Sequence, residues 1–338
     1  MGNEMKQIAL FEQGIHPTPI VEMSGDYGKN RYYIKREDMI PFSFGGNKAR
    51  KAAEFYKEIK DCEADIVMTY GSNSSNHCRI IANMACAMGL ACHIISPEEN
   101  REMLYNTRLV EEFGAVIETC PVTKVSETID RRVEAYRQEG KNPYFILGGG
   151  HGNPGTRACV NTYREIADYE EQTGICFDYI FHASGTGTTQ AGLVSGKLLM
   201  EDRKRKNAQT VKEKKIVGIS IARNEERGRE VVRQSVEEYL GEKYQALYKE
   251  EELIFTDAYC MGGYGKYTQE VKQTIEEVMA KDGIPMDSTY VGKAFYGMKR
   301  YVEEHQICGK NILFVHTGGA PLYFDLLDKG QETERRQA

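Results

Sequence analysis

The sequence lacks the long apolar segments that would place a protein in a membrane. No apolar run approaches the roughly 20 residues that a helix needs to cross a bilayer, and residues 1–10 contain no apolar core of a signal peptide. Position 6 is Lys6, where a myristoylation signal that starts at Gly2 requires Ser or Thr. We therefore expect a cytoplasmic protein with no membrane partner.

Paired cysteines and an excess of positive charge are absent as well. The 9 cysteines form no Cys-x-x-Cys pair, which indicates reduced thiols rather than a disulfide framework. His77, His151 and His182 do not show the spacing of metal ligands, so we expect no metal. The formal net charge of −6 argues against nucleic acid as a partner. The basic run 203–206 is interpreted as a solvated connection between two structured segments.

Strand-like and helix-like segments alternate along the chain, with no internal repeat. This order predicts an α/β fold with mostly parallel sheets covered by helices on both faces. With 338 residues, more than one domain is expected. The predicted strands are 66–70, 92–96, 116–120, 144–147, 177–183, 216–221 and 312–316. The predicted helices are about 76–89, 98–113, 125–139, 155–173, 190–199, 230–239 and 268–281.

Ligands bind to such sheets at the carboxyl ends of the strands. The turns after Tyr70, Leu147, Ala183 and His316 are rich in Gly, Ser, Thr or Asn. We therefore expect the chemistry of the protein at these four turns. His316 itself is expected to be a hydrogen-bonded residue near the core.

Lys48 follows two glycines in the segment GGNKARK, residues 45–51, at a probable helix start. The glycines would let the backbone approach a flat ligand, and a lysine in its neutral form can make a Schiff base. A surface lysine in the first turn of a basic helix is the alternative that this segment alone leaves open.

Two polar turns are candidate anion sites. The turn 71–77 (GSNSSNH) precedes a helix, whose N-terminal amides would suit a carboxylate, although helix capping by Ser74 or Ser75 is an alternative. The turn 184–190 (SGTGTTQ) predicts a cradle of backbone N–H groups for a phosphate. It is neither a Walker loop nor a GxGxxG motif, and a plain strand-to-helix turn is its alternative.

In this order, the motifs resemble those of the D-cysteine desulfhydrase and aminocyclopropane-carboxylate (ACC) deaminase family, which are tryptophan synthase β-like enzymes dependent on pyridoxal 5′-phosphate. The resemblance runs from about residue 34 to 323. It is carried by KRED (35–38), GGNKARK (45–51), SNH (75–77), the Gly/Thr loop (185–189), GYG (263–265), YVGKA (290–294) and HTGGAP (316–321).

The resemblance implies a role for each matched residue. Lys48 would hold the cofactor as a Schiff base and move the Cα proton of the substrate, and Ser75 would be a candidate proton relay. Tyr264 and Tyr290 would flank the substrate. The remaining implied contacts are Lys51 near the cofactor phosphate, Asn76 at the ring 3-oxygen, Ser75, Asn76 and His77 at the substrate carboxylate, Gly185, Thr186, Gly187, Thr188 and Thr189 at the phosphate, and Thr317 at the pyridine nitrogen.

Two positions distinguish the subfamilies. ACC deaminases resemble SNQ and YEGK where this chain has His77 and Val291. Valine leaves the neutral hydroxyl of Thr317 as the partner of the ring nitrogen, which favours loss of a good β-leaving group over ring opening. The chain departs from the family pattern at Ser74, at 267–268 and at 287–289, all near the expected substrate pocket.

We therefore expect a fold type II enzyme with its cofactor in the cleft between two three-layer domains. The large domain would comprise residues 1–51 plus 157–338, and the small domain residues 52–156. The expected reaction is α,β-elimination from a small amino acid such as D-cysteine. The alternatives are ACC deamination, elimination from cysteate, β-replacement and a non-catalytic sensor. The family also suggests a homodimer.

Overall fold

The computed structural model describes residues 5–72, 74–98 and 103–337, with side chains described up to residue 328. Its larger sheet has six strands in the order β1-β2-β10-β7-β8-β9, and all neighbouring pairs are parallel except β1 with β2. The strands are β1 Ile20–Glu22, β2 Arg31–Arg36, β7 Tyr179–Ser184, β8 Lys215–Ser220, β9 Ile254–Thr256 and β10 Asn311–His316.

A second sheet of four parallel strands has the order β5-β4-β3-β6. Its strands are β3 Ile66–Tyr70, β4 Ala91–Pro97, β5 Val116–Cys120 and β6 Pro143–Ile146. The two mostly parallel sheets confirm the predicted α/β fold. All four strands fall within the range 52–156, whose status as a separate domain stays a prediction.

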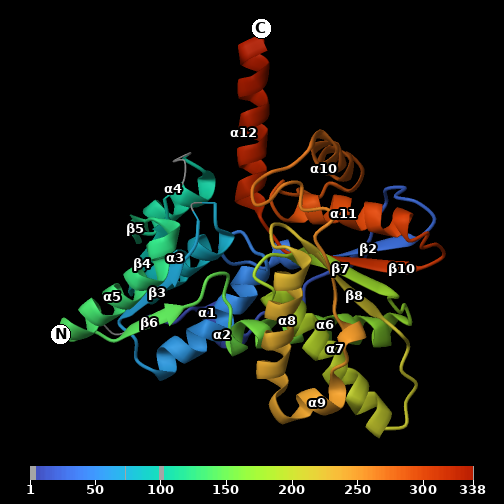
Figure 1. Cartoon of the computed structure of the whole chain (residues 1–338), viewed down its shortest axis with the longest axis horizontal. Coiled ribbons are helices and arrows are strands. Elements are labelled where there is room, and N and C mark those ends of the chain that lie inside the picture. The colour runs from blue at the N-terminus through green and yellow to red at the C-terminus, as the bar shows by residue number, and fades with distance from the viewer. Residues whose placement is uncertain (1–4, 73, 99–102, 338) are drawn as a thin grey trace.

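Helices cover the sheets on both sides, and α2 lies between the two sheets (Figure 1). Consecutive residues of β7 point to opposite faces. Phe181 belongs to the core that α10 and α11 cover, whereas Ile180 belongs to the core beneath α6, α7 and α8. The longer helices are α2 Asn47–Asp61, α3 Asn76–Met88, α4 Tyr105–Glu112, α5 Val125–Gln138, α6 Asn153–Thr173, α7 Thr188–Lys206, α8 Glu225–Leu240, α10 Gln269–Asp282, α11 Val291–Glu304 and α12 Ala320–Gln337, and two short ones are α1 Ala9–Gln13 and α9 Tyr244–Leu247.

The structure corrects two expectations about the elements. The basic run 203–206 is the last turn of α7 rather than a connection, because Arg205 and Lys206 pair with Glu201 and Asp202 one turn earlier. Helix α4 begins at Tyr105, later than the predicted start at residue 98. Among the described residues, no helix has the length and apolar character needed to cross a membrane.

Candidate active site

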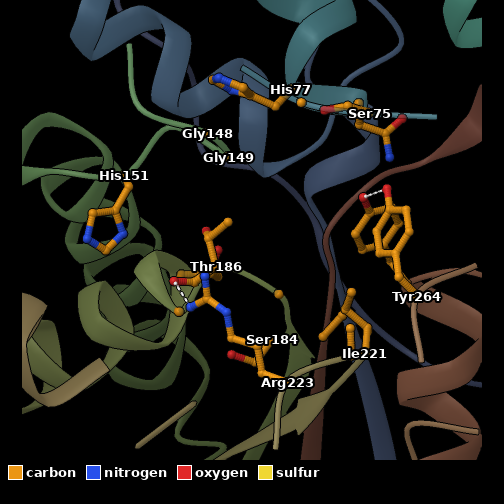
Figure 2. A pocket seen from close by; sticks show the side chains of 18 of the residues that line it. Ser75, His77, Gly148, Gly149, His151, Ser184, Thr186, Ile221, Arg223 and Tyr264 are labelled. Atoms are coloured by element: carbon orange, nitrogen blue, oxygen red, sulfur yellow. Dashed lines mark hydrogen bonds between the residues drawn. The ribbon is translucent and has the colours of Figure 1, made fainter. Parts of the chain in front are cut away.

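A cavity with a volume of 710 Å³ opens at the carboxyl ends of strands from both sheets. Each of the four turns singled out in the sequence contributes to its wall. They are joined by the start of α2, the loop after β8, and two tyrosines. Figure 2 shows Ser75 and His77 on one side of this cavity, Thr186, Ser184 and Arg223 across from them, and Tyr264 beside Ile221.

The start of α2 is pressed against the end of β10. Gly46 has a φ of 98°, and a Cβ atom there would lie 2.7 Å from the carbonyl oxygen of Thr317. The N–H of Asn47 donates to that same oxygen at 3.1 Å. Only glycine tolerates both this φ and this approach. The contact places Lys48, the next residue, on the cavity wall beside Thr317.

In the part of the chain that the structure describes, the amine of Lys48 forms no ion pair with a carboxylate. Its Nζ donates to the carbonyl oxygen of Gly149 at 2.9 Å, and Nζ of Lys51 donates to the same oxygen at 3.2 Å. Burial lowers the pKa of Lys48 well below its ordinary value, and repulsion from Lys51 lowers it further. The lowered pKa favours the neutral amine, the form that reacts with a carbonyl group.

Lys51 does not reach the cavity. Its side chain is buried, and burial also lowers its pKa. It is absent from the cavity wall among the described residues, because its chain is directed along Gly150, where a Cβ atom would meet Lys51 Cδ at 3.1 Å. Contact between Lys51 and a cofactor phosphate stays a prediction.

The first residues of α3 present polar groups to the cavity. Ser75 caps the helix, its Oγ accepting from the N–H of Cys78 at 3.2 Å. The amide of Asn76 is oriented from behind, because its Oδ1 accepts from Asn106 at 3.0 Å and from Arg79 at 3.4 Å. Arginine has only donors, so this oxygen faces Arg79 and the Asn76 NH₂ group is left for a ligand.

The imidazole of His77 is held as a neutral ring. It is 2% exposed, and its Nε2 lies 2.8 Å from the hydroxyl oxygen of Thr69. Burial lowers its pKa well below the ordinary value, and Lys48 and Lys51 add to the effect. Burial also raises the pKa of the neighbouring Cys78 to about 12, so this thiol is protonated and does not form a reactive pair with His77.

The loop between β7 and α7 has the features of an anion cradle. Across the described residues, the backbone N–H groups of residues 186–189 have no acceptor, as expected for the first turn of a helix. Gly187 has a φ of 92°, and the hydroxyl of Thr189 is fixed by Asn47 at 2.9 Å. Thr188 is buried behind the wall, where its hydroxyl lies 3.1 Å from His151 Nδ1. The buried hydroxyl of Ser184 reaches the wall and has no hydrogen-bond partner among the described residues.

Two tyrosines close the cavity on the side of α11. The hydroxyl oxygens of Tyr264 and Tyr290 are 2.5 Å apart, and that of Tyr264 also lies 3.0 Å from Ser74 Oγ and 3.2 Å from Ser72 Oγ. Burial, together with the Tyr264 hydroxyl, raises the pKa of Tyr290 well above its ordinary value. Tyr290 is therefore protonated near neutral pH and can donate.

Two arginines on the wall were not predicted from the sequence. Arg223 and Arg227 line the cavity and form no ion pair among the described residues, and Nη1 of Arg223 donates to the carbonyl oxygen of Thr186 at 3.1 Å. Both follow the predicted strand 216–221, and ligands are expected at the carboxyl ends of the strands, so the sequence held a signal that could have identified them. No described residue of the wall is Asp or Glu. The described part of the chain also holds no group of three or more metal-ligating side chains. His316 is buried and hydrogen-bonded to Pro285 O, as expected.

Parallel α/β sheets, a lysine of lowered pKa at a helix start and an anion cradle across one cavity together define an enzyme site for a flat anionic cofactor. Comparison with known proteins gives the family. Residues 11–318 match the model of the pyridoxal-phosphate dependent enzyme family, and the chain belongs to this family.

Relatives and one solved structure agree with this assignment. The chain is 30% identical to a D-cysteine desulfhydrase of Yersinia pestis over 91% of its own length and 92% of that protein. It is 32% identical to a protein of Pyrococcus abyssi proposed to be a 1-aminocyclopropane-1-carboxylate deaminase, over 86% and 85% of the two chains. The crystal structure of an ACC deaminase homologue superposes with a TM-score of 0.80 at 31% identity, covering 93% of each chain. The protein is therefore a pyridoxal-phosphate enzyme of fold type II, as predicted.

Proposed function

We propose that the protein catalyses α,β-elimination from a small amino acid, with D-cysteine as the substrate and pyruvate, ammonia and hydrogen sulfide as products. The observation that carries this proposal is the composition of the cavity wall. Lys48 faces donors at Ser75 and Asn76 and a pair of phenols, and no described wall residue is a carboxylate. The wall therefore offers proton transfer and anion binding in one space.

The residues present fit the cofactor. The unpartnered N–H groups of 186–189 suit its phosphate, and the amine of Lys48 suits its aldehyde carbon. The NH₂ group of Asn76 and the hydroxyl of Thr317 are available to its ring. When bound, pyridoxal phosphate supplies an electron sink that stabilises negative charge on the substrate Cα.

The substrate carboxylate is assigned to the start of α3, where Ser75, Asn76 and the helix dipole favour an anion. The neutral imidazole of His77 adds no charge there. With the carboxylate fixed, Lys48 Nζ is the base for the Cα proton, because its lowered pKa keeps a free lone pair. Ser75 is the candidate relay between this amine and solvent.

The leaving group is assigned to the side of Tyr264 and Tyr290. As the Cα proton moves to Lys48, the Cβ–S bond breaks and its electron pair leaves with sulfur. One phenol donates its proton to the thiolate, and the 2.5 Å contact lets the second phenol stabilise the resulting charge. The released enamine is hydrolysed by water to pyruvate and ammonia without a further protein group.

The surroundings of the ring nitrogen argue for elimination over ACC ring opening. Val291 is fully buried in the core, its side chain has no polar group, and its N–H donates to Asp287 at 3.1 Å. Thr317 then offers a hydroxyl, which stabilises a protonated ring nitrogen far less than a carboxylate does. A weaker electron sink suits thiolate, chloride or sulfite as leaving groups.

Elimination from cysteate is a second candidate, which Arg223 and Arg227 favour. Two guanidinium groups on one wall, with no carboxylate partner among the described residues, are suited to an additional negative charge on the substrate. Arg227→Gln would then weaken activity on cysteate while sparing activity on cysteine.

Keto-acid formation from a set of substrates tests the proposal. Purified protein loaded with pyridoxal phosphate is mixed separately with D-cysteine, L-cysteine, β-chloro-D-alanine, cysteate and ACC. We expect pyruvate from D-cysteine and β-chloro-D-alanine, and little or no 2-oxobutanoate from ACC. Turnover of ACC at a kcat/KM equal to that of D-cysteine would overturn the argument from Val291 and Thr317.

The family resemblance supports three coarser assignments. We infer a small domain of residues 52–156, a homodimer and a cytoplasmic location. Light scattering of the purified protein measures the oligomeric state, and a single-chain mass would contradict the dimer.

A further inference from the structure

A fully buried lysine behind the tyrosine pair makes contacts that the proposed chemistry does not use. Lys293 lies in the first turn of α11, with 0% of its surface exposed. Its Nζ donates to three backbone carbonyl oxygens, those of Gly263 at 2.7 Å, Cys260 at 3.0 Å and Ile221 at 3.1 Å. An ammonium group has three donors, so these carbonyls satisfy all of them, and the described residues give it no carboxylate partner.

The three carbonyls belong to two segments that form the cavity wall. Ile221 directly follows β8, and its side chain lines the cavity. Cys260 and Gly263 belong to the loop that carries Tyr264. One ammonium group therefore joins the end of a sheet strand to the loop that presents a phenol to the cavity.

This loop needs an external attachment because its backbone is irregular. Four of its residues have positive φ, namely Met261 (51°), Gly262 (81°), Gly263 (122°) and Gly265 (70°). Among the described residues, its internal backbone bonds are limited to turns, such as Gly263 N–H to Cys260 O at 3.0 Å. Such a segment has a high conformational entropy when free, so the contacts of Lys293 restrict it substantially.

The position of the charge argues against a role in filling space. Lys293 lies at the N-terminal end of α11, where the helix dipole disfavours a cation, and its burial is unfavourable for any charge. An apolar side chain of similar length would fill the volume without either penalty, but it could not draw three carbonyl oxygens to one point. Carbonyl oxygens arranged in this way are the ligands that monovalent cations take in proteins.

We propose that the ammonium group of Lys293 is a built-in cation that positions Tyr264 and Ile221 for the leaving-group step. It is a positioning residue rather than a catalytic one, because it acts through backbone carbonyls and does not reach the cavity wall. The role assigned to Tyr264 rests on the proposed function, whereas the attachment of the loop does not.

Chemical rescue tests the charge itself. Lys293→Ala removes the ammonium group and three methylene groups, a volume that n-propylammonium refills. We expect kcat with D-cysteine to fall at least tenfold while the absorbance of bound cofactor is retained, and n-propylammonium to restore activity severalfold. Sodium chloride at equal ionic strength and neutral 1-propanol should restore none. The same amine added to the unsubstituted enzyme corrects for its own reaction with the cofactor.

A matched control lies on the same helix. Lys299 is partly exposed and pairs with Glu277 at 2.7 Å, so Lys299→Ala should leave kcat unchanged. Equal rescue of Lys293→Ala by 1-propanol would overturn the proposal, because the lysine would then only fill space. A second test is the double-mutant cycle of Lys293→Met and Tyr264→Phe. The two losses in kcat should not multiply if Lys293 acts through Tyr264, and full multiplication would contradict that route.

Hydrogen exchange measures the mobility of this loop directly and needs no substrate. Burial lowers the pKa of Lys293 to about 8, while Cys260 and Asp287 are the titratable groups that oppose this shift. Exchange of residues 260–266, corrected for its intrinsic pH dependence, should rise as the pH passes 8, and it should do so in Cys260→Ser too. Unchanged corrected exchange would overturn the attachment even if elimination activity is found. A rise in a protein without elimination activity would support the attachment and refute only the proposed function.

Discussion

Helix α2 carries two cations that are two residues apart and have opposite surroundings. Arg50 is bound by two carboxylates, its Nε 2.7 Å from Glu37 Oε2 and its Nη1 2.5 Å from Glu165 Oε1. Although burial opposes its charge, these partners raise its pKa. Among the described residues, Lys48 Nζ has a carbonyl oxygen as its hydrogen-bond partner and the like charge of Lys51 nearby, and burial lowers its pKa. The presence or absence of a carboxylate therefore separates a fixed structural charge from a reactive amine within one turn.

Arg50 and its carboxylate partners belong to a network of ion pairs that holds α2 in place. Burial alone would raise the pKa of Glu37, but Arg50 and Lys35 lower it to about 2. Lys35 in turn lies 2.6 Å from Glu165 on α6. The network joins β2, α2 and α6, and thereby fixes the helix from which Lys48 projects into the cavity.

The largest effect on activity is expected from Lys48, the cation of α2 without a carboxylate partner among the described residues. Lys48→Ala removes the amine that we assign to cofactor attachment and proton transfer, so turnover should fall by ~1,000-fold or more. Some cofactor should still bind through the 186–189 cradle. Keto-acid release from D-cysteine measures this, with Lys57→Ala, an exposed lysine on the same helix, as the control. A loss below tenfold would refute the assignment.

Substitution of Arg50, the cation with carboxylate partners, should change the stability of the fold more than the rate of turnover. Arg50→Met leaves Glu37 buried without its main partner, which should lower the free energy of unfolding by about 3–5 kcal/mol. Urea denaturation measures the change, and Lys57→Met provides the exposed comparison. An effect as small as that of Lys57→Met would show that the network does not hold α2.

The same network predicts a loss of stability in acid. The pKa of Glu37 is about 2 in the folded chain, whereas the ordinary pKa of a glutamate side chain is 4.5. A lowered pKa stabilises the fold above pH 4.5, and this contribution of about 3 kcal/mol is lost as the pH falls towards 2. Unfolding free energies measured from pH 5 downwards should show the loss. The pH dependence should be shallower in Glu37→Gln, and an identical slope would contradict the assignment.

A smaller effect is expected at the cofactor cradle. Gly187 has a φ of 92°, and a Cβ atom there would lie 3.0 Å from Val232 Cγ2. Gly187→Val should therefore distort the 186–189 loop and weaken pyridoxal phosphate binding by about tenfold or more. Gly174→Val is the matched control, because Gly174 also has positive φ but faces open space. Equal cofactor affinity in the two variants would place the phosphate elsewhere.

The smallest effect should come from a surface pair. Lys206 and Asp202 lie 2.7 Å apart on α7 with the lysine side chain 72% exposed. Lys206→Ala should change the free energy of unfolding by about 0.5 kcal/mol or less. A change as large as that of Arg50→Met would remove the contrast between buried and exposed pairs.

Local patterns in the sequence predicted the parts of the fold that short segments determine. Strand β3 was predicted with its observed bounds, because an apolar run is followed directly by Gly71. Strand β2 was not predicted because it contains the buried Lys35. A prediction from the hydrophobic pattern places charged residues at the surface. Pairing with Glu165, 130 residues away, and with Glu37 allows the burial of Lys35.

In the candidate site, too, the sequence predicted what short segments determine and not what depends on distant segments. Motifs identified Lys48, the start of α3 and the Gly/Thr loop. The orientation of the Asn76 amide by Asn106, the sharing of Gly149 O by two lysines and the contacts of Lys293 were not predictable, because each joins segments far apart in the sequence.

The most direct test of the account is to identify the lysine that holds the cofactor. Lys48 lies on the cavity wall and Lys51 and Lys293 are buried near it, and borohydride fixes pyridoxal phosphate to whichever amine carries it. Tryptic mapping by mass spectrometry then distinguishes the peptide 37–50, which ends at Arg50 and contains Lys48, from peptides that contain Lys51 or Lys293. We predict the cofactor mass on peptide 37–50 alone. Cofactor fixed to Lys51 or Lys293, or fixed to no lysine in protein reconstituted with pyridoxal phosphate, would contradict the account.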